Sequence, residues 1–123
     1  MTTSPAPSTA PGTEQRQPPT PLPNAGNIVQ TAGINQWSKD HVGRIAFVMQ
    51  SLRRHLVGDD GDLTPDDKTL NEHARATGTG FVLSAYEIPV GSDLRDPGDD
   101  RIWIHTILSG ADTYTTVLFP QEY

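Results

Sequence analysis

The sequence predicts an α+β fold in which two helices pack on a three-stranded antiparallel β-meander, behind a disordered proline-rich tail. Three observations predict this fold. Apolar residues between 37 and 56 recur at helical spacing, residues 58–67 hold stop and start signals for helices, and short β-branched and aromatic runs follow residue 80. The chain has 123 residues, a length that suits one domain.

The tail is predicted from composition. Residues 1–26 contain seven of the eleven prolines, at positions 5, 7, 11, 18, 19, 21 and 23, together with many Ser and Thr and few large apolar residues. Such a segment cannot bury enough surface to offset the entropy lost on ordering. We therefore expect residues 1–26 to be disordered and residues 27–123 to form a single small α+β domain.

The first helix is expected over residues 37–56, after an irregular lead-in at 27–34. The apolar residues of one helical face are Trp37, Ile45, Val48, Met49, Leu52 and Leu56. Asn35 or Ser38 can cap its beginning, and Gly58 is suited to the left-handed residue that ends it.

The second helix is expected from Thr64 to about Ala76. Thr64 can act as the N-cap, Pro65 fits the first helical position, and Asp66 and Asp67 complement the positive end of the helix dipole. Its apolar face is narrow, which predicts a helix on the domain surface with one side in water.

Three strands are expected at 81–88, 102–108 and 114–119, joined by a long acidic connection at 89–100 and a tight hairpin at 109–112. Both faces of the second strand carry large apolar side chains, so it is predicted to lie in the centre of the sheet. The closing residues 119–123 are predicted to fold back on the sheet.

Charge and composition exclude several classes of function. Fifteen acidic residues against nine basic ones disfavour binding to nucleic acid, whose phosphates require clustered cations. No cysteine is present, and no window approaches the length of a membrane span. We expect a cytoplasmic protein with no membrane association, no cofactor, and an oligomeric state that the sequence leaves open.

The acidic segment 58–67 allows three interpretations: a metal site, a surface for a basic partner, or a turn between two capped helices. Metal binding is disfavoured because Asp59 and Asp60 are adjacent, whereas calcium loops place their ligands at alternate positions. Capping accounts for Thr64, Asp66 and Asp67. The remaining carboxylates, together with two in the 89–100 connection, are the predicted partner-binding residues: Asp59, Asp60, Asp62, Asp99 and Asp100.

The histidines offer little support for a metal centre, because none pairs with another at zinc-ligand spacing. One catalytic hypothesis remains. Metal-independent ribonucleases of the barnase and RelE type also place helices before an antiparallel sheet and use residues on the sheet face for proton transfer. If this alternative holds, the catalytic residues are His105, Arg101 and Tyr114.

Several short segments in order resemble a family of short uncharacterised bacterial proteins described as plasmid-related. The matching segments are Arg54-His55, residues 58–63 with Asp66, Asp67 and Asn71, residues 83–86, residues 102–104 with Thr106, and residues 115–123. The chain departs from the family pattern at Asp60, in the 89–100 loop and in the 109–113 turn. The resemblance implies carriage on a plasmid, phage or integrated element and assigns no catalytic residue.

The expected function is that of a non-enzymatic accessory protein of such an element. It binds a protein partner through its acidic loops, and a sharper version has these loops imitate nucleic-acid phosphates and inhibit a host defence nuclease. The alternative is a small endoribonuclease of the barnase or RelE type.

Overall fold

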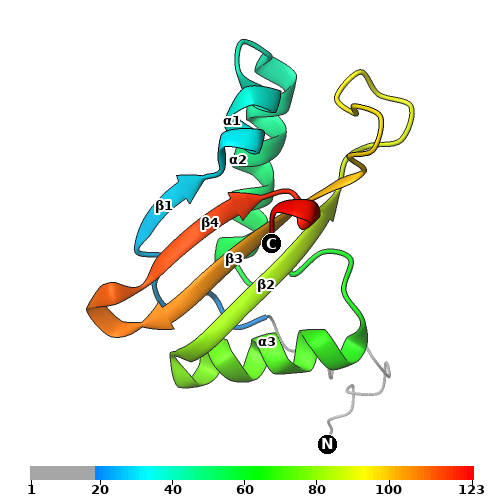
Figure 1. Ribbon diagram of the computed structural model, residues 1–123. Helices are drawn as coiled ribbons and strands as arrows, with labels where there is room; N and C mark the ends of the chain where they lie inside the picture. The colour runs from blue at the N-terminus through cyan, green and yellow to red at the C-terminus, as the bar shows by residue number, and fades with distance from the viewer. Residues whose placement is uncertain (1–18) are drawn as a thin grey trace, which may run out of the picture.

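Three α-helices and a four-stranded sheet make up residues 19–123, the part of the chain that the computed structural model describes (Figure 1). The helices are α1 (Ala32–Ser38), α2 (Val42–Leu56) and α3 (Pro65–Thr77). The strands are β1 (Asn27–Gln30), β2 (Thr79–Glu87), β3 (Arg101–Ser109) and β4 (Tyr114–Leu118), and two 3-10 turns are η2 (Gly110–Asp112) and η3 (Pro120–Glu122). The predicted α+β class is confirmed, but the described chain has one helix and one strand more than predicted.

The sheet has the strand order β1-β4-β3-β2. β2, β3 and β4 form the predicted antiparallel meander, and β3 is an interior strand as predicted. β1 adds a fourth strand parallel to β4, so the prediction of a purely antiparallel, three-stranded sheet is wrong. All four side chains of β1 are exposed, and this strand therefore shows no alternation of apolar and polar residues in the sequence.

The predicted helix over 37–56 corresponds to α2, which begins only at Val42. Its first predicted residues, Trp37 and Ser38, belong to α1, and the lead-in predicted as irregular at 27–34 holds β1 and the start of α1. The chain turns between α1 and α2 at Asp40, which has a left-handed backbone with φ of +60°. The hydroxyl of Thr31 caps α1 by accepting from the amide of Ile34 at 3.3 Å, and Nδ1 of His41 caps α2 by accepting from Arg44 at 3.2 Å. The expected caps were Asn35 and Ser38, because the apolar period runs on from Trp37 and hides the break.

The second predicted helix is confirmed as α3. The hydroxyl of Thr64 accepts from the amide of Asp67 at 3.2 Å, and the helix ends at Gly78 with φ of +73°. Leu70 is 67 % exposed, in agreement with a helix on the surface. In Figure 1, α3 lies along one edge of the sheet and α2 lies behind it.

The core lies between one face of the sheet and the helices. Alternate residues of β3 point into it, and Ile102 and Ile104 are fully buried. One cluster packs these residues against α1 and α2, and a second cluster joins α3 to Val82, Leu108 and Leu22. The same face buries several polar side chains, which are described below. Among residues 19–123, no helix has the length and apolar character needed to cross a bilayer.

Both ends of the described chain pack on the domain. Leu22 is buried, and its amide donates to the carbonyl of Leu56 at 2.9 Å. The predicted tail therefore includes residues 19–26 that contact the domain, while its residues 1–18 lie outside the described part. At the other end the ring of Tyr123 lies 5.5 Å from Trp103 and 5.4 Å from His105. The predicted return of the closing residues to the sheet is confirmed.

Candidate functional site

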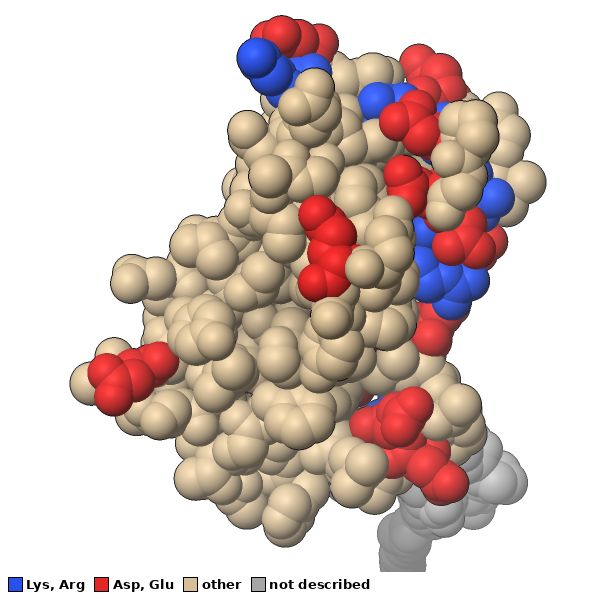
Figure 2. Space-filling view, viewed as in Figure 1, with Lys and Arg blue, Asp and Glu red and all other residues tan. Residues whose placement is uncertain are grey.

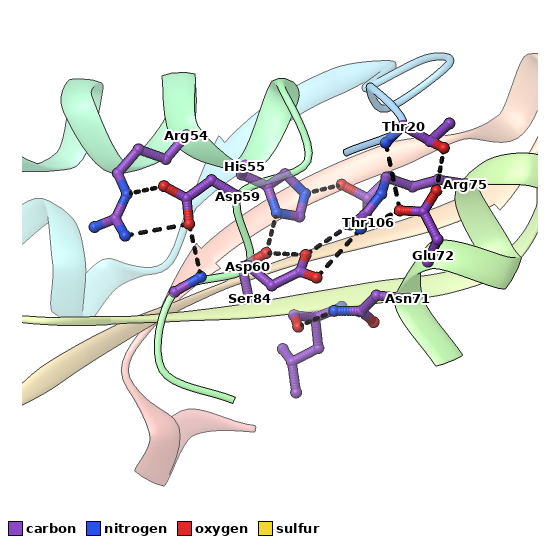
Figure 3. A network of polar contacts seen from close by, with 12 residues as sticks. Thr20, Arg54, His55, Asp59, Asp60, Asn71, Glu72, Arg75, Ser84 and Thr106 are labelled. Atoms are coloured by element: carbon purple, nitrogen blue, oxygen red, sulfur yellow. Dashed lines mark hydrogen bonds and ion pairs between the residues drawn. The ribbon is translucent and has the colours of Figure 1, made fainter. Parts of the chain in front are cut away.

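A network of polar side chains crosses the core between α2, α3 and the sheet (Figure 3). Its centre is His55, in the last turn of α2, which is completely buried. Nδ1 of His55 lies 2.7 Å from the hydroxyl of Ser84 on β2, and Nε2 lies 2.8 Å from the hydroxyl of Thr106 on β3. Both ring nitrogens therefore have a partner, and those partners come from neighbouring strands.

The hydroxyl groups fix the tautomer of His55. Thr115 donates to the carbonyl of Ala25 at 2.8 Å, so it must accept from Thr106, which lies 2.7 Å away. A hydroxyl has one proton to donate. Thr106 therefore accepts from Nε2 of His55, and Nδ1 accepts from Ser84. The result is a chain of hydrogen bonds with a single direction, from Ser84 to the carbonyl of Ala25.

His55 is neutral in this arrangement. Burial, and after it the nearby charge of Arg75, together lower the pKa of His55 from 6.5 to about 4. In an imidazolium, Ser84 would accept from Nδ1 and donate instead to Asp60, 3.5 Å away, so the hydrogen bonds alone permit both states. The lowered pKa is what makes the ring neutral.

A buried ion pair lies next to His55. Arg75 of α3 donates to both carboxylate oxygens of Asp60 at 2.6 and 3.2 Å, and the two side chains are 2 % and 4 % exposed. Arg75 also donates to Glu72 at 3.0 Å. Burial alone would lower the pKa of Arg75, but the hydrogen bonds to Asp60 and Glu72 outweigh it and raise the pKa. Asp60 also lies 3.5 Å from the hydroxyl of Ser84, which places the ion pair beside the histidine.

Glu72 extends the network towards residues 19–26. The backbone amide and the hydroxyl of Thr20 both donate to its carboxylate. The hydroxyl of Thr20, and then Arg75, lower the pKa of Glu72. The network thus ties α2, α3, three strands and the segment around Thr20 and Ala25 together.

The pair Ser84 and His55 has the spacing of a nucleophile and its base. Both residues are 0 % exposed, so a substrate has no access to them in this fold. The network is therefore a structural element of the core. Sequence reasoning missed the network because its members come from two helices, three strands, the 58–63 turn and the segment around Thr20. The resemblance covers His55, Asp60, Ser84, Thr106 and Thr115 but does not bring them together.

The acidic turn at 58–63 covers part of the edge of β2 and pairs with its backbone. The amide of Ala85 donates to the carbonyl of Asp60 at 3.1 Å, and the amide of Asp62 donates to the carbonyl of Ala85 at 2.8 Å. Gly61 sits against Ala85 with φ of +73°, and a Cβ there would lie 1.9 Å from the carbonyl oxygen of Ala85. The turn thus needs glycine at this position and acts as a short strand at the sheet edge.

The carboxylates of this turn differ in their surroundings. Asp59 accepts from Arg54 at 2.6 and 3.2 Å and from the amide of Gly61, and the bond to Arg54 lowers its pKa. Asp60 is buried with Arg75, so its predicted role in contacting a partner does not fit this fold. Asp62 is exposed. Of the three, Asp62 has the side chain most accessible to another protein.

The other two predicted partner residues lie in the 89–100 connection. Asp99 accepts from Nε2 of Gln121 at 2.6 Å, which ties the loop to η3. Asp100 is exposed and lies 3.2 Å from Nε of Arg101, and this contact lowers the pKa of Asp100. Both carboxylates lie at the margin of the sheet.

The three residues of the ribonuclease hypothesis share the open face of the sheet, opposite the core. His105 and Arg101 lie on β3, and Tyr114 faces Ile107 from β4. His105 and Arg101 are four residues apart, which corresponds to about 13 Å along a strand. Arg101 contacts Asp100, and the tyrosine whose ring lies beside His105 is Tyr123 and not Tyr114. The structure gathers these residues on one face but not at one catalytic centre.

The ring of His105 lies between Phe81, at 5.3 Å, and Tyr123. Burial lowers its pKa. Its Nε2 atom is buried and has no hydrogen-bond partner within residues 19–123. A buried polar atom without a partner costs free energy. His105 therefore differs from His55, whose two nitrogens are both satisfied.

The open face carries almost no charge. Figure 2 shows it as a broad uncharged surface, with acidic and basic residues at its margins and one acidic patch beside the C-terminal turn. On β2, β3 and β4 the outward side chains are uncharged except for Glu87 and Arg101, which face each other at one end. Large apolar side chains are exposed there, including Phe81 at 56 %, Tyr114 at 44 % and Tyr123 at 66 %.

Within residues 19–123, no group of three or more His, Asp or Glu side chains is placed to hold a metal ion. Comparison of the chain with protein-family models, curated proteins and solved structures found no match.

Proposed function

We propose that this chain is a non-enzymatic accessory protein of a plasmid, phage or integrated element, and that it binds a protein partner through the open face of its sheet. The observation that carries the proposal is the uncharged surface around Phe81, Tyr114 and Tyr123. Soluble proteins rarely expose large contiguous apolar patches, and such patches commonly mark protein interfaces. Aromatic residues at the centre of an uncharged patch are typical of interface hot spots.

The chemistry of the partner follows from the margins of the patch. Acidic side chains at the margins, among them Asp62 and Asp99, favour a partner with basic residues around an apolar centre. The acidic loops predicted to make the contact thus supply the rim and not the centre. Host defence nucleases have basic surfaces for nucleic acid, and inhibition of such a nuclease is the specific activity that we propose.

Affinity capture with matched variants tests the binding. The full chain, immobilised through its N-terminus, is incubated with a lysate of the cells that carry it. The double variant Phe81→Lys/Tyr114→Lys places two charges on the open face, while Val42→Lys adds a charge at a residue that is 82 % exposed on α2. The wild type and Val42→Lys should retain a basic protein that the double variant does not retain.

Two results would contradict this proposal: no specific protein retained by the wild type, or equal retention by all three chains. The nuclease version has its own assay, in which restriction or RNA-guided nucleases are titrated with the purified chain. Full nuclease activity in the presence of excess chain at low salt would exclude inhibition of those enzymes.

The ribonuclease alternative is favoured by one observation, the shared face of His105, Arg101 and Tyr114. RNA incubated with the protein in EDTA tests it. Under this alternative the RNA is cleaved, and His105→Ala abolishes the cleavage. Intact RNA would exclude a metal-independent ribonuclease.

A further inference from the structure

A groove runs between α3 and the edge of β2. It has a volume of about 520 Å³ and is lined mainly by apolar side chains, including Leu63, Leu70, Ala74, Phe81 and Leu83. It adjoins the open face, because Phe81 belongs to both. None of its lining residues is Lys or Arg, which makes it a poor site for phosphate groups.

The backbone of β2 shows which groups line this edge. The amide of Leu83 donates to the side-chain oxygen of Asn71 at 3.2 Å, and the carbonyl of Leu83 accepts from the side-chain nitrogen of Asn71 at 2.8 Å. Two residues further on, the acidic turn satisfies the amide and the carbonyl of Ala85. The backbone groups of these residues therefore point away from β3, towards the edge.

Phe81 lies two residues before Leu83, so its backbone has the same orientation. Its amide and carbonyl form no hydrogen bond with any part of residues 19–123 outside the sheet ladder. The residue is 56 % exposed and lines the groove. Within the described chain, one donor and one acceptor of the strand edge thus have no partner at the wall of an apolar groove.

Asn71 indicates what chemistry fits beside this edge. Its primary amide offers one acceptor and one donor to Leu83, as a peptide unit of an added strand would. The same pairing is open at Phe81, where the small side chains of Ala74 and Thr77 leave the groove unfilled. An amide group is therefore the complement of both positions.

We infer that the groove binds a short extended peptide segment of the protein partner, with one peptide unit paired to the backbone of Phe81. An aliphatic side chain of that segment lies between Leu63 and Leu70. Asp67 lines the groove and is exposed, so a basic residue next to the aliphatic one completes the match. Asn71 on one side and the turn at Gly78 on the other limit the added strand to a few residues. The inference rests on the proposed function, since the segment belongs to the protein partner.

A peptide mixture tests the groove without knowledge of the partner. The probe is a mixture of capped pentapeptides with lysine at both ends and valine, leucine, isoleucine or phenylalanine at the three central positions. The matched control mixture has proline at the central position, which removes the amide that would pair with Phe81. Proton–nitrogen NMR of the full chain should show shifts at Thr79, Phe81 and Leu83 with the first mixture and not with the second.

Hydrogen exchange gives a readout specific to backbone pairing. In the free protein the amide of Leu83 should exchange more slowly than that of Phe81, and the probe should slow the exchange of Phe81. Phe81→Pro removes the edge amide, and Phe81→Ala removes the same ring while keeping the amide. Because a net hydrogen bond corresponds to a few-fold change in affinity, Phe81→Pro should bind the probe about threefold to tenfold more weakly than Phe81→Ala.

The remaining outcomes overturn the inference. Equal binding by the two variants, or no NMR shift at the groove, would exclude strand addition at Phe81. Slow exchange of the Phe81 amide without the probe would mean that a segment of this protein already fills the groove. If that exchange rate depends on protein concentration, the segment belongs to a second copy of the chain. If capture of a partner depends on Tyr114 but not on the amide of Phe81, the proposed function is supported and only the peptide site in the groove is excluded.

Discussion

The histidines on the two faces of the sheet differ in their hydrogen bonding. On the inner face, His55 is buried with a partner at each ring nitrogen, and the adjacent ion pair of Asp60 and Arg75 is bidentate. On the open face, His105 lies between two aromatic rings and its Nε2 has no partner in the described chain. A polar group whose bonds are satisfied within the domain holds the fold together. On the open face a second molecule can contact the exposed aromatic side chains around His105, while Nε2 of His105 itself is buried.

The largest expected effect concerns the buried ion pair. Arg75→Met leaves the carboxylate of Asp60 buried without its cation, and should lower the free energy of unfolding by about 3–5 kcal/mol. Arg54→Met is the matched control, since Arg54 pairs with Asp59 at a half-exposed site and should cost about 1 kcal/mol or less. Urea denaturation measures both. Equal losses would show that burial does not distinguish the two pairs.

The pH dependence of stability tests the state of His55. Because its pKa in the folded protein is about 4, the unfolded chain takes up a proton that the folded protein does not. The free energy of unfolding should therefore fall as the pH decreases from about 6.5 to about 4, by roughly 3 kcal/mol in total. His105, with its pKa also lowered, contributes in the same direction, and His105→Asn removes its share.

NMR titration of the His55 ring isolates the group. Its resonances should remain those of the neutral Nε2-protonated form down to about pH 5. A midpoint near 6.5 would contradict the lowered pKa of the buried ring, and resonances of the Nδ1-protonated form would contradict the direction of the hydrogen-bond chain from Ser84 to Ala25.

The edge of β2 should show a smaller effect. Asn71→Leu removes both hydrogen bonds to Leu83 and should cost about 1–2 kcal/mol. It should also speed the exchange of the Leu83 amide and increase self-association, because the edge loses its cover. Thr69→Ala, an exposed change on the same helix, serves as the control and should leave both measurements unchanged.

The smallest effect on stability is expected on the open face. Phe81→Ser should change the free energy of unfolding by less than about 1 kcal/mol, because the ring is more than half exposed. Its neighbour Val82 points to the core and is 0 % exposed, so Val82→Ser should cost several times more. Thermal denaturation of the two variants compares the faces directly, and similar losses would mean that Phe81 belongs to the core.

The elements that local chemistry determines were predictable from the sequence. The helix α3 follows from Thr64, Pro65 and Gly78, and the interior position of β3 follows from apolar residues on both its faces. β1 was missed because it is held by backbone pairing with β4 and has no buried side chain. The break at Asp40 was missed because the apolar period continues across it.

The candidate sites were harder to predict. Asp60 has the same local sequence signals as Asp59 and Asp62, and only its distance from Arg75 in the fold separates a core ion pair from a surface carboxylate. The alternation in β3 is visible in the sequence and puts Trp103 and His105 on the same face of the strand. The outward positions of β2 and β4, which extend that face, become evident only once the register of the strands is known.

The shortness of β1 has a consequence for how this protein behaves at high concentration. Strand-to-strand stacking requires a run of free backbone groups, and β1 offers only four residues, with Ile28 and Val29 about half exposed. The opposite edge is interrupted by Asn71 and the acidic turn. Fibril-like growth from the native fold therefore has no long template at either end of the sheet. A protein can in this way keep an apolar surface exposed for a partner and remain dispersed while that partner is absent.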